Sequence, residues 1–149
     1  MAGKEKKSRR LLWLLPLGVY CALMLWLLFG QRWGTELYRQ NLAENMNLQP
    51  FATLQLYWQL LQGGDGSLVR HAFINLAGNV IMFIPLGFLL PKAFAGLRKF
   101  FKVFFLCGLL IVLVEAVQYV TLLGTCDVDD LILNMAGVTL GYILYRCTR

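Results

Sequence analysis

Four long apolar stretches constrain this chain more than any other feature of its sequence. They cover residues 11–29, 72–90, 103–123 and about 131–145. A helix needs roughly 20 apolar residues to cross the core of a bilayer, and the last stretch reaches that length only if its helix begins near Asp127. Only 15% of the residues are charged, against about 25% in a typical soluble domain. The sequence therefore predicts an all-α, polytopic membrane protein with a bundle of four transmembrane helices, at 11–29, 71–91, 103–123 and 127–145.

Basic residues are distributed unevenly among the segments that connect these helices. They gather in residues 1–10, in the short connection 92–102 and at the C-terminal end, whereas the long connection 30–70 holds only Arg32, Arg39 and Arg70. Basic residues concentrate on the cytoplasmic side of membrane proteins. We therefore expect a protein of the cytoplasmic membrane with both termini in the cytoplasm. Because the basic residues lie mainly in these connecting segments, the net charge of +6 does not indicate a nucleic-acid partner.

The first apolar stretch also has the basic start of a signal peptide. The apolar region of a signal peptide is about 7–15 residues long and ends at small residues. Here the stretch is longer and ends in Phe29-Gly30-Gln31-Arg32-Trp33. We therefore favour an uncleaved membrane anchor.

The four cysteines predict neither an intramolecular disulfide framework nor a zinc site. They include no C-x-x-C pair, and the expected topology leaves Cys126 alone on the outer side. A disulfide between two chains through Cys126 stays an alternative.

The outer connection 30–70 contains one predicted helix. A turn precedes the helix at Pro50, because the residue before a proline is pushed out of the helical conformation. Gln55, Gln59 and Gln62 then recur at helical spacing among leucine, tyrosine and tryptophan residues, and two glycines at 63–64 end the pattern. Since Tyr and Trp favour the membrane surface, the segment is either an interfacial or re-entrant helix against the outer leaflet or a helix that packs on the bundle.

Polar side chains recur on one face of each of the last three predicted membrane helices, where they are costly in lipid. With the expected topology, these faces reach one level, roughly 6–12 Å below the outer ends of the helices. We predict a polar pocket at that level, open toward the outer face and closed below. Its candidate functional residues are Asn75, Asn79, Glu115, Gln118, Asp127, Asp130 and Asn134. Asp129 is expected to point away from this face.

Structural alternatives exist for each of these features. Buried amides often join helices by hydrogen bonds, and Asp127 followed by two acids fits a helix N-cap. Gly137-x-x-x-Gly141 fits close helix packing, and His71 fits an ordinary interface residue. The carboxyl groups could also support acid–base chemistry or hold a divalent cation. Without a P-loop, nucleophile elbow or H-E-x-x-H motif, we expect a binding pocket with no metal and no cofactor.

Four sequence motifs, in this order along the chain, resemble those of the VanZ-like family. They are Asn47-Leu-x-Pro50-Phe51-x-Thr53, then Asn75-Leu-Ala-Gly78-Asn79 continuing to Pro85-Leu-Gly87, then Glu115-x-x-Gln118, and finally Asp127-Val-Asp129-Asp130 continuing to Asn134, Gly137 and Gly141-Tyr142. The resemblance covers about residues 39–145 and marks Pro50, Gly78, Pro85, Gly137 and Gly141 as structural positions. It implies a four-helix membrane protein. The namesake of the family is associated with resistance to teicoplanin, a lipid-bearing glycopeptide that acts at the outer surface of the cytoplasmic membrane.

Three functions are consistent with these features. The first is a non-enzymatic protein that binds a lipoglycopeptide or a lipid-linked envelope molecule at the outer leaflet, in glycopeptide resistance or cell-envelope homeostasis. The second is a membrane-embedded enzyme acting on a lipid-linked envelope precursor, with Glu115 or Asp130 as acid or base. The third is a helper subunit that docks on another membrane protein. Four helices are few for a secondary transporter. The lipid bilayer is the one expected partner in all three, and the oligomeric state is not predicted.

Overall fold

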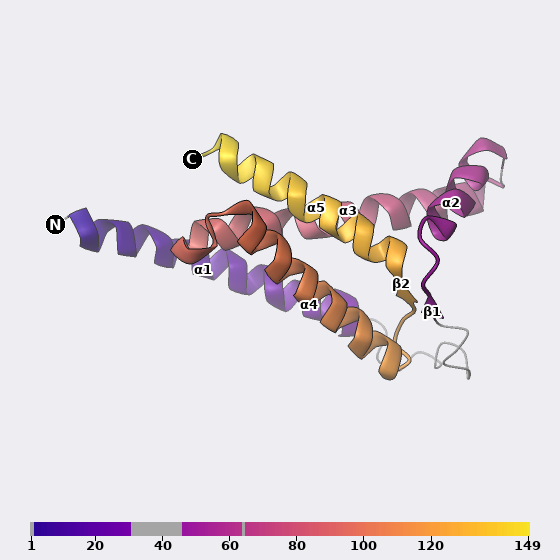
Figure 1. The fold of residues 1–149 in the computed structure, drawn as a ribbon, viewed down its shortest axis with the longest axis horizontal. Coiled ribbons are helices and arrows are strands. Elements are labelled where there is room, and N and C mark those ends of the chain that lie inside the picture. Colours follow the sequence, from indigo (N-terminus) through magenta and orange to yellow (C-terminus); the bar gives the residue numbers. More distant parts are fainter. Residues whose placement is uncertain (1, 31–45, 64) are drawn as a thin grey trace.

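The computed structural model of the chain describes residues 2–30, 46–63 and 65–149, with side chains from residue 11 onward. Arg32 and Arg39 therefore lie outside the described residues. The elements in chain order (Figure 1) are α1 (Ala2–Leu25), the π-helical turn η1 (Trp26–Gly30), β1 (Met46–Asn47), α2 (Ala52–Gly63), α3 (Gly66–Ala93), the 3₁₀ turn η3 (Ala95–Leu97), α4 (Phe100–Val120), β2 (Cys126–Asp127) and α5 (Val128–Cys147).

Among the described residues, four helical segments are long and apolar enough to cross a membrane. They are Leu11–Gly30, which joins most of α1 to η1, and the helices α3, α4 and α5. The strands β1 and β2 are two residues each and pair in parallel. The prediction of an all-α protein with four membrane-spanning helices is therefore confirmed. The helix predicted in the long connection is also present as α2, and it ends at Gly63 as expected.

The four long helices all begin at positions other than those expected from the apolar stretches, with α1 beginning at Ala2 and α4 at Phe100. Helix α3 begins at Gly66 rather than at residue 71, because its exposed and less apolar first turns continue the same helix. Helix α5 begins at Val128, and Asp127 is its N-cap rather than its first residue. The apolar stretches therefore indicate which helices are present but not the residues at which these helices begin.

Helix α4 ends at Val120 rather than at residue 123, because the backbone reverses there. Leu122 has a positive φ angle of 56°, in the left-handed region. The Leu122 N–H donates to the Tyr119 carbonyl (3.2 Å) and the Leu123 N–H to the Gln118 carbonyl (2.9 Å). These two bonds and the left-handed residue form a Schellman motif, which closes a helix.

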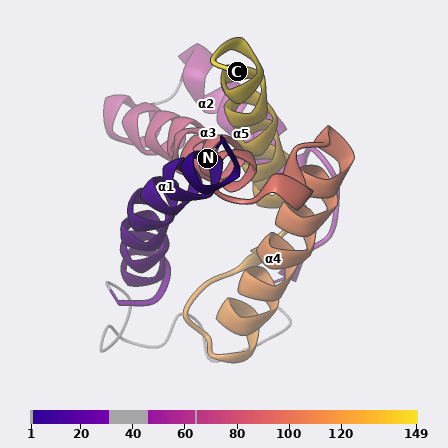
Figure 2. The same cartoon turned by 90° about the vertical axis from the view of Figure 1, so that its left-hand side faces the viewer.

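The two chain ends lie at one end of the bundle, and α2, β1 and β2 lie at the other (Figure 1). We call these the terminal end and the loop end. Figure 2, viewed from the terminal end, shows α1 and α4 on opposite sides, with α3 and α5 between them. The contacts agree, since α1 packs on α3, α3 on α5, and α5 on α4.

Helices α3 and α5 approach each other so closely that their contact requires glycine. A Cβ atom added at Gly137 or Gly141 would overlap the carbonyl oxygen of Val80 or Ile84, and one added at Gly87 would overlap a carbonyl oxygen of α5. Small residues allow such backbone contact in membrane helices. The prediction of close packing at Gly137 and Gly141 is therefore confirmed.

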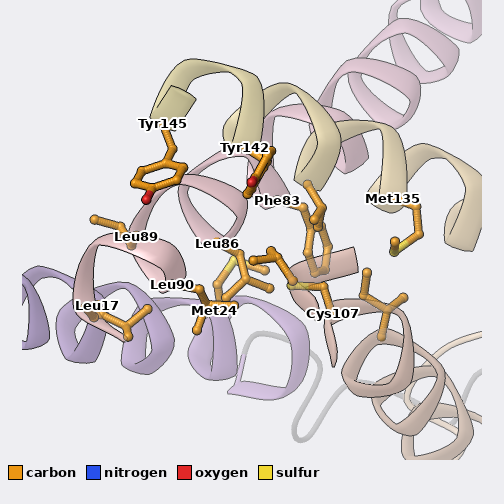
Figure 3. Close-up of a cluster of buried hydrophobic side chains, with 14 residues drawn as sticks. Leu17, Met24, Phe83, Leu86, Leu89, Leu90, Cys107, Met135, Tyr142 and Tyr145 are labelled. Atoms are coloured by element: carbon orange, nitrogen blue, oxygen red, sulfur yellow. The ribbon is translucent and has the colours of Figure 1, made fainter. Parts of the chain in front are cut away.

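A cluster of buried apolar side chains fills the bundle from its middle toward the terminal end (Figure 3). The residues labelled there are Leu17, Met24, Phe83, Leu86, Leu89, Leu90, Cys107, Met135, Tyr142 and Tyr145. Two hydroxyl groups fasten its edges: Tyr20 donates to the Met82 carbonyl (2.8 Å) and Tyr142 to the Arg98 carbonyl (2.7 Å). This packing leaves the polar residues of the same helices toward the loop end.

Candidate functional site

The polar side chains of α3, α4 and α5 line one cavity of about 570 Å³. Two leucines of η1 and residues of the α4–α5 connection complete the wall, and His71 contributes its imidazole. The polar candidates from the sequence that line it are Asn75, Asn79, Glu115, Gln118, Asp130 and Asn134. Asp127 is the one candidate that does not line it. The structure thus brings together residues from three helices that lie far apart along the chain.

A chain of hydrogen bonds runs from α2 across α3 to α5 beside this cavity. The Asn75 Nδ2 donates to the Tyr57 hydroxyl (2.6 Å). The Asn79 Nδ2 donates both to the Asn75 Oδ1 (3.3 Å) and to the Asp130 Oδ1 (2.6 Å). Asn75 and Asn79 are neighbours because residues four apart share a helix face. The amides therefore join three helices and hold the Asp130 carboxylate at the cavity wall.

Gln118 connects α4 to the end of the first membrane segment. Its side chain is only 4% exposed, and its Nε2 donates to the carbonyl oxygen of Leu28 (2.9 Å). That carbonyl belongs to the π-helical turn η1. Gln118 therefore closes the cavity wall between α1 and α4, which lie apart in Figure 2.

Asn134 is the most unusual polar residue of the cavity. It is 4% exposed, and its Oδ1 has no hydrogen-bond partner in the described part of the chain. Across the cavity, a Cβ atom added at Gly78 would meet nothing within 4 Å. A buried amide oxygen that lacks a partner normally lowers stability. Asn134 is therefore a functional candidate both by its hydrogen bonding and by its place in the cavity wall.

Asp129, which the helical pattern placed away from the polar face, occupies a site of its own. It is fully buried. Its Oδ1 accepts the Phe51 N–H (2.6 Å) and its Oδ2 accepts the Leu54 N–H (3.0 Å). The first N–H groups of a helix have no partner within the helix, and here a carboxylate from a distant helix binds them. Asp129 therefore caps α2 from outside.

The backbone before α2 forms a tight turn that presents these N–H groups. The Ala52 N–H donates to the Gln49 carbonyl (3.4 Å), with Pro50 and Phe51 between them. Phe51 has a positive φ angle of 66°. Proline followed by a residue of positive φ is the pattern of a type II turn, although glycine usually takes the second position. The expected turn at Pro50 is confirmed, and Asp129 holds Phe51 in its strained conformation.

Asp127 joins the same clamp instead of the cavity. Its Oδ1 accepts the Asp129 N–H (2.8 Å), as an N-cap does. Its Oδ2 accepts the Thr53 hydroxyl (2.6 Å) and the Asn47 Nδ2 (3.3 Å). β1 and β2 pair beside it, with Asn47 opposite Asp127. We call these five residues the α2 clamp: Asn47, Phe51, Thr53, Asp127 and Asp129.

The residues of this clamp were visible in the sequence as polar side chains, but helix periodicity could not show that they pair. The motif around Pro50 carries Asn47 and Thr53, two polar side chains beside the start of the predicted helix. The motif at the start of α5 carries more carboxylates than one N-cap requires. Only the pairing of β1 with β2 shows that the two motifs satisfy each other.

Cys126 lies on β2, outside the membrane-spanning segments. Burial raises the pKa of its thiol, and the nearby carboxylates of Glu115 and Asp127 raise it further. The described residues contain no group of three or more histidine, cysteine or acidic side chains placed to hold a metal ion.

Comparison with known protein families identifies the family of this chain. The family model described as VanZ/LLP1 matches residues 13–149, nearly the whole chain. The chain belongs to the VanZ/LLP1 family. The resemblance noted from its motifs is thereby confirmed, and it extends through the first membrane segment. No curated protein and no solved structure matches the chain. Membership in VanZ/LLP1 and four apolar helices identify a multi-pass membrane protein.

Proposed function

We propose that this VanZ/LLP1 protein lies in the cytoplasmic membrane with both termini in the cytoplasm and binds the polar headgroup of an amphiphile from the outer face. The observation that carries the proposal is the cavity itself. Three helices contribute acidic and amide groups to it, although such groups are costly within a membrane. A packed apolar cluster lies toward the terminal end, so the polar cavity can open only toward the loop end.

The charges of the described residues support this orientation. The terminal end carries Lys92, Arg98, Lys99, Lys102 and Arg146. The described acidic residues of the α2–β2 region and the cavity lie at the opposite end. Because basic residues favour the cytoplasmic side, the loop end faces outward and the cavity meets ligands of the outer leaflet.

The ligands that fit this location are a lipoglycopeptide such as teicoplanin or a lipid-linked envelope molecule. Binding either one at the outer leaflet would alter access of the antibiotic to its target. The function we propose is therefore glycopeptide resistance or cell-envelope homeostasis, carried by a binding cavity.

Three substitutions in the cavity test this function. Glu115→Gln, Asp130→Asn and Asn79→Ala are expressed in a teicoplanin-susceptible host, and membrane levels and teicoplanin susceptibility are measured. We expect each variant to reach the membrane and to lose most of the change in susceptibility that the wild type produces. Thr139→Val is the matched control, because its hydroxyl donates to the Met135 carbonyl of its own helix (2.8 Å) and does not line this cavity. Wild-type behaviour of all three cavity variants would show that the amides only join helices.

A second candidate, a membrane-embedded enzyme, has one observation in its favour. Glu115 and Asp130 both line the same cavity, and two carboxyl groups in one site suit acid–base chemistry on a lipid-linked precursor. The Glu115→Gln variant separates the two functions. If the purified variant still binds its amphiphile but overexpression no longer alters the lipid-precursor profile, the cavity is catalytic.

A further inference from the structure

Helices α4 and α5 leave a second hollow between them, an apolar groove within the membrane-spanning segments. It has a volume of about 560 Å³, and its lining residues run from Phe104 to Val112 on α4 and from Leu131 to Thr139 on α5. Thr139 carries the one hydroxyl group among these lining residues, and this group donates to the Met135 carbonyl of its own helix (2.8 Å). A ligand of this groove therefore meets mainly apolar side chains.

Toward the terminal end, each wall of the groove continues to a basic residue. On α4, Lys102 precedes the lining residue Phe105 by three positions. On α5, Arg146 follows the lining residue Thr139 by seven positions. Residues at these spacings share a helix face, and both basic side chains are exposed. Each wall thus changes from apolar to cationic as it approaches the terminal end.

The α3–α4 connection packs on α5 at the same end of the groove. The Phe100 and Tyr142 rings have centroids 5.3 Å apart, and the Tyr142 hydroxyl donates to the Arg98 carbonyl (2.7 Å). Arg146 follows Tyr142 by one helical turn, on the same face of α5. Basic side chains of both segments therefore lie at one end of the seam between α4 and α5. We call them the basic cluster: Arg98, Lys99, Lys102 and Arg146.

The basic cluster has no acidic residue near it along the chain. None occurs between Asp65 and Glu115, and none occurs after Asp130. Glu115 is 15 residues beyond the start of α4, which is about 22 Å along the helix. The positive charge of the cluster is therefore not balanced by carboxylates of its own segments.

Lys92, at the same end of the bundle, has partners inside the protein. Its Nζ donates to the Thr148 carbonyl (3.2 Å) and lies 5.2 Å from the ring centroids of Trp13 and Phe88. Aromatic faces attract a cation placed in this way. Lys92 therefore joins the ends of three helices, and it serves as a comparison for the exposed basic cluster.

Helix length places the basic cluster at the membrane surface. Helix α4 has 21 residues and Lys99 is its N-cap. Such a helix is about 30 Å long, which equals the thickness of the hydrocarbon core. The cluster therefore lies at the level of the lipid headgroups, and the groove lies at the level of the acyl chains.

We propose that the seam between α4 and α5 binds one anionic phospholipid from the leaflet at the terminal end. Its phosphate lies at the basic cluster, and one acyl chain lies in the groove. The exposed rings of Phe101 and Phe105, with centroids 6.4 Å apart, line the path between them. Basic pockets between membrane helices bind anionic headgroups in this way. The inference does not depend on the cavity at the loop end or on its ligand.

Two lipids with the same dioctanoyl chains test the choice of headgroup. Phosphatidylglycerol is anionic, and phosphatidylcholine is zwitterionic. Each is titrated into the purified full-length protein in an uncharged detergent, and saturable binding is followed by the rise in unfolding temperature. We expect phosphatidylglycerol to bind about twentyfold more tightly, from about fivefold for each of two basic residues. Equal affinities for the two lipids would overturn the proposal.

Single neutral substitutions test the basic cluster. Lys102→Gln and Arg146→Gln should each lose about fivefold in affinity for phosphatidylglycerol and keep their affinity for phosphatidylcholine. Arg70→Gln is the matched control, because it removes the same charge from the first turns of α3 at the loop end. Lys92→Gln should unfold at a lower temperature without lipid and still prefer phosphatidylglycerol. If Arg70→Gln loses as much affinity as the cluster variants, net charge alone explains the preference and the proposed site is wrong.

Filling the groove tests the place of the acyl chain. Gly108→Ala adds a methyl group at ordinary contact distance from the Met135 sulfur (3.7 Å), whereas Gly108→Leu projects a larger side chain into the groove. We expect the leucine variant to lose about tenfold in affinity for both lipids and the alanine variant to keep the wild-type affinity. Light scattering of the same samples reports the oligomeric state. Wild-type lipid binding by the leucine variant would refute the proposal, and if that variant also converts a wild-type dimer to a monomer, the groove binds a second copy of the chain instead.

Discussion

The terminal end and the loop end of this bundle hold their helices together by different means. At the terminal end, apolar side chains interdigitate and glycines bring the backbones of α3 and α5 into contact. At the loop end, amides and carboxylates form hydrogen bonds between helices, and a cavity of about 570 Å³ stays among them. The same pair of helices, α3 and α5, takes part in both arrangements.

This difference shows how one bundle can be stable and still carry a costly site. Contacts between helices in a membrane depend on close packing, since lipid tails are as apolar as leucine. The glycine contact supplies such packing at Gly87, Gly137 and Gly141. Its presence lets the other end of α3 and α5 hold Asn79, Asp130 and Asn134 without dense packing around them. The two ends are therefore predicted to respond differently to substitution.

The largest effect is expected at the glycine contact. Gly141→Ala places a methyl group against the carbonyl oxygen of Ile84, so α3 and α5 must separate. Overpacking of this kind costs about 1–3 kcal/mol of folding free energy, occasionally more. Unfolding in mixed micelles of a mild detergent and dodecyl sulfate measures the loss. Gly78→Ala, on α3 at the cavity, is the control and should be neutral or slightly stabilising; similar losses at both glycines would show that the two ends do not differ.

A smaller and more local effect is expected in the α2 clamp. Asp129→Asn replaces one carboxylate oxygen by an N–H₂ group, which faces a backbone N–H and cannot accept it. Hydrogen bonds to charged groups contribute about 1.5–3 kcal/mol. The free energy required for local opening of α2 should therefore fall by that amount, while α3 and α5 stay paired. Hydrogen exchange of the α2 amides measures the opening. In Asp65→Asn, an exposed carboxylate bonded to Ser67 (2.9 Å) is changed, and exchange in α2 should stay as in the wild type. Uniform acceleration over all helices would contradict a local clamp.

The smallest effect is expected in the chemistry of the two cysteines that mark the two regions. Cys126 is partly exposed on β2, whereas Cys107 is fully buried in the apolar cluster. Burial and neighbouring carboxylates raise the Cys126 pKa, so less of it is thiolate at neutral pH, and its labelling by a membrane-impermeant maleimide should quicken as the pH rises. Glu115→Gln removes one of those charges, lowers the pKa and should raise the rate at fixed pH by about twofold to threefold.

The side from which the maleimide reaches Cys126 also tests the proposed orientation. Labelling of intact cells should modify Cys126 and leave Cys107 unmodified. Labelling of Cys126 only after the cells are opened would place the loop end in the cytoplasm, and a rate independent of pH would contradict the cause given for the raised pKa.

Helix periodicity was sufficient for the residues whose role depends on one helix face. Asn75, Asn79, Glu115, Gln118, Asp130 and Asn134 line the cavity as their spacing indicated, because residues three and four apart share a face. It was insufficient for Asp127, which is the N-cap of α5 and precedes its first turn. It placed Asp129 away from the cavity, as the structure does, but it could not show that this side chain binds N–H groups at the start of α2.

The sequence by itself determined the four membrane-spanning helices, the helix between the first two, and the faces that carry polar residues. These follow from hydropathy, spacing and turn-forming residues, which act over a few neighbours along the chain. Only the tertiary structure decided that Asp127 and Asp129 fasten α2, because the Phe51 N–H and the Thr53 hydroxyl that they bind lie more than 70 residues away in the chain. It also decided which amide groups form contacts between helices, and that the Asn134 oxygen has no partner among the described residues. Which polar groups pair depends on the distances between helices, and no local pattern in the sequence predicts these distances.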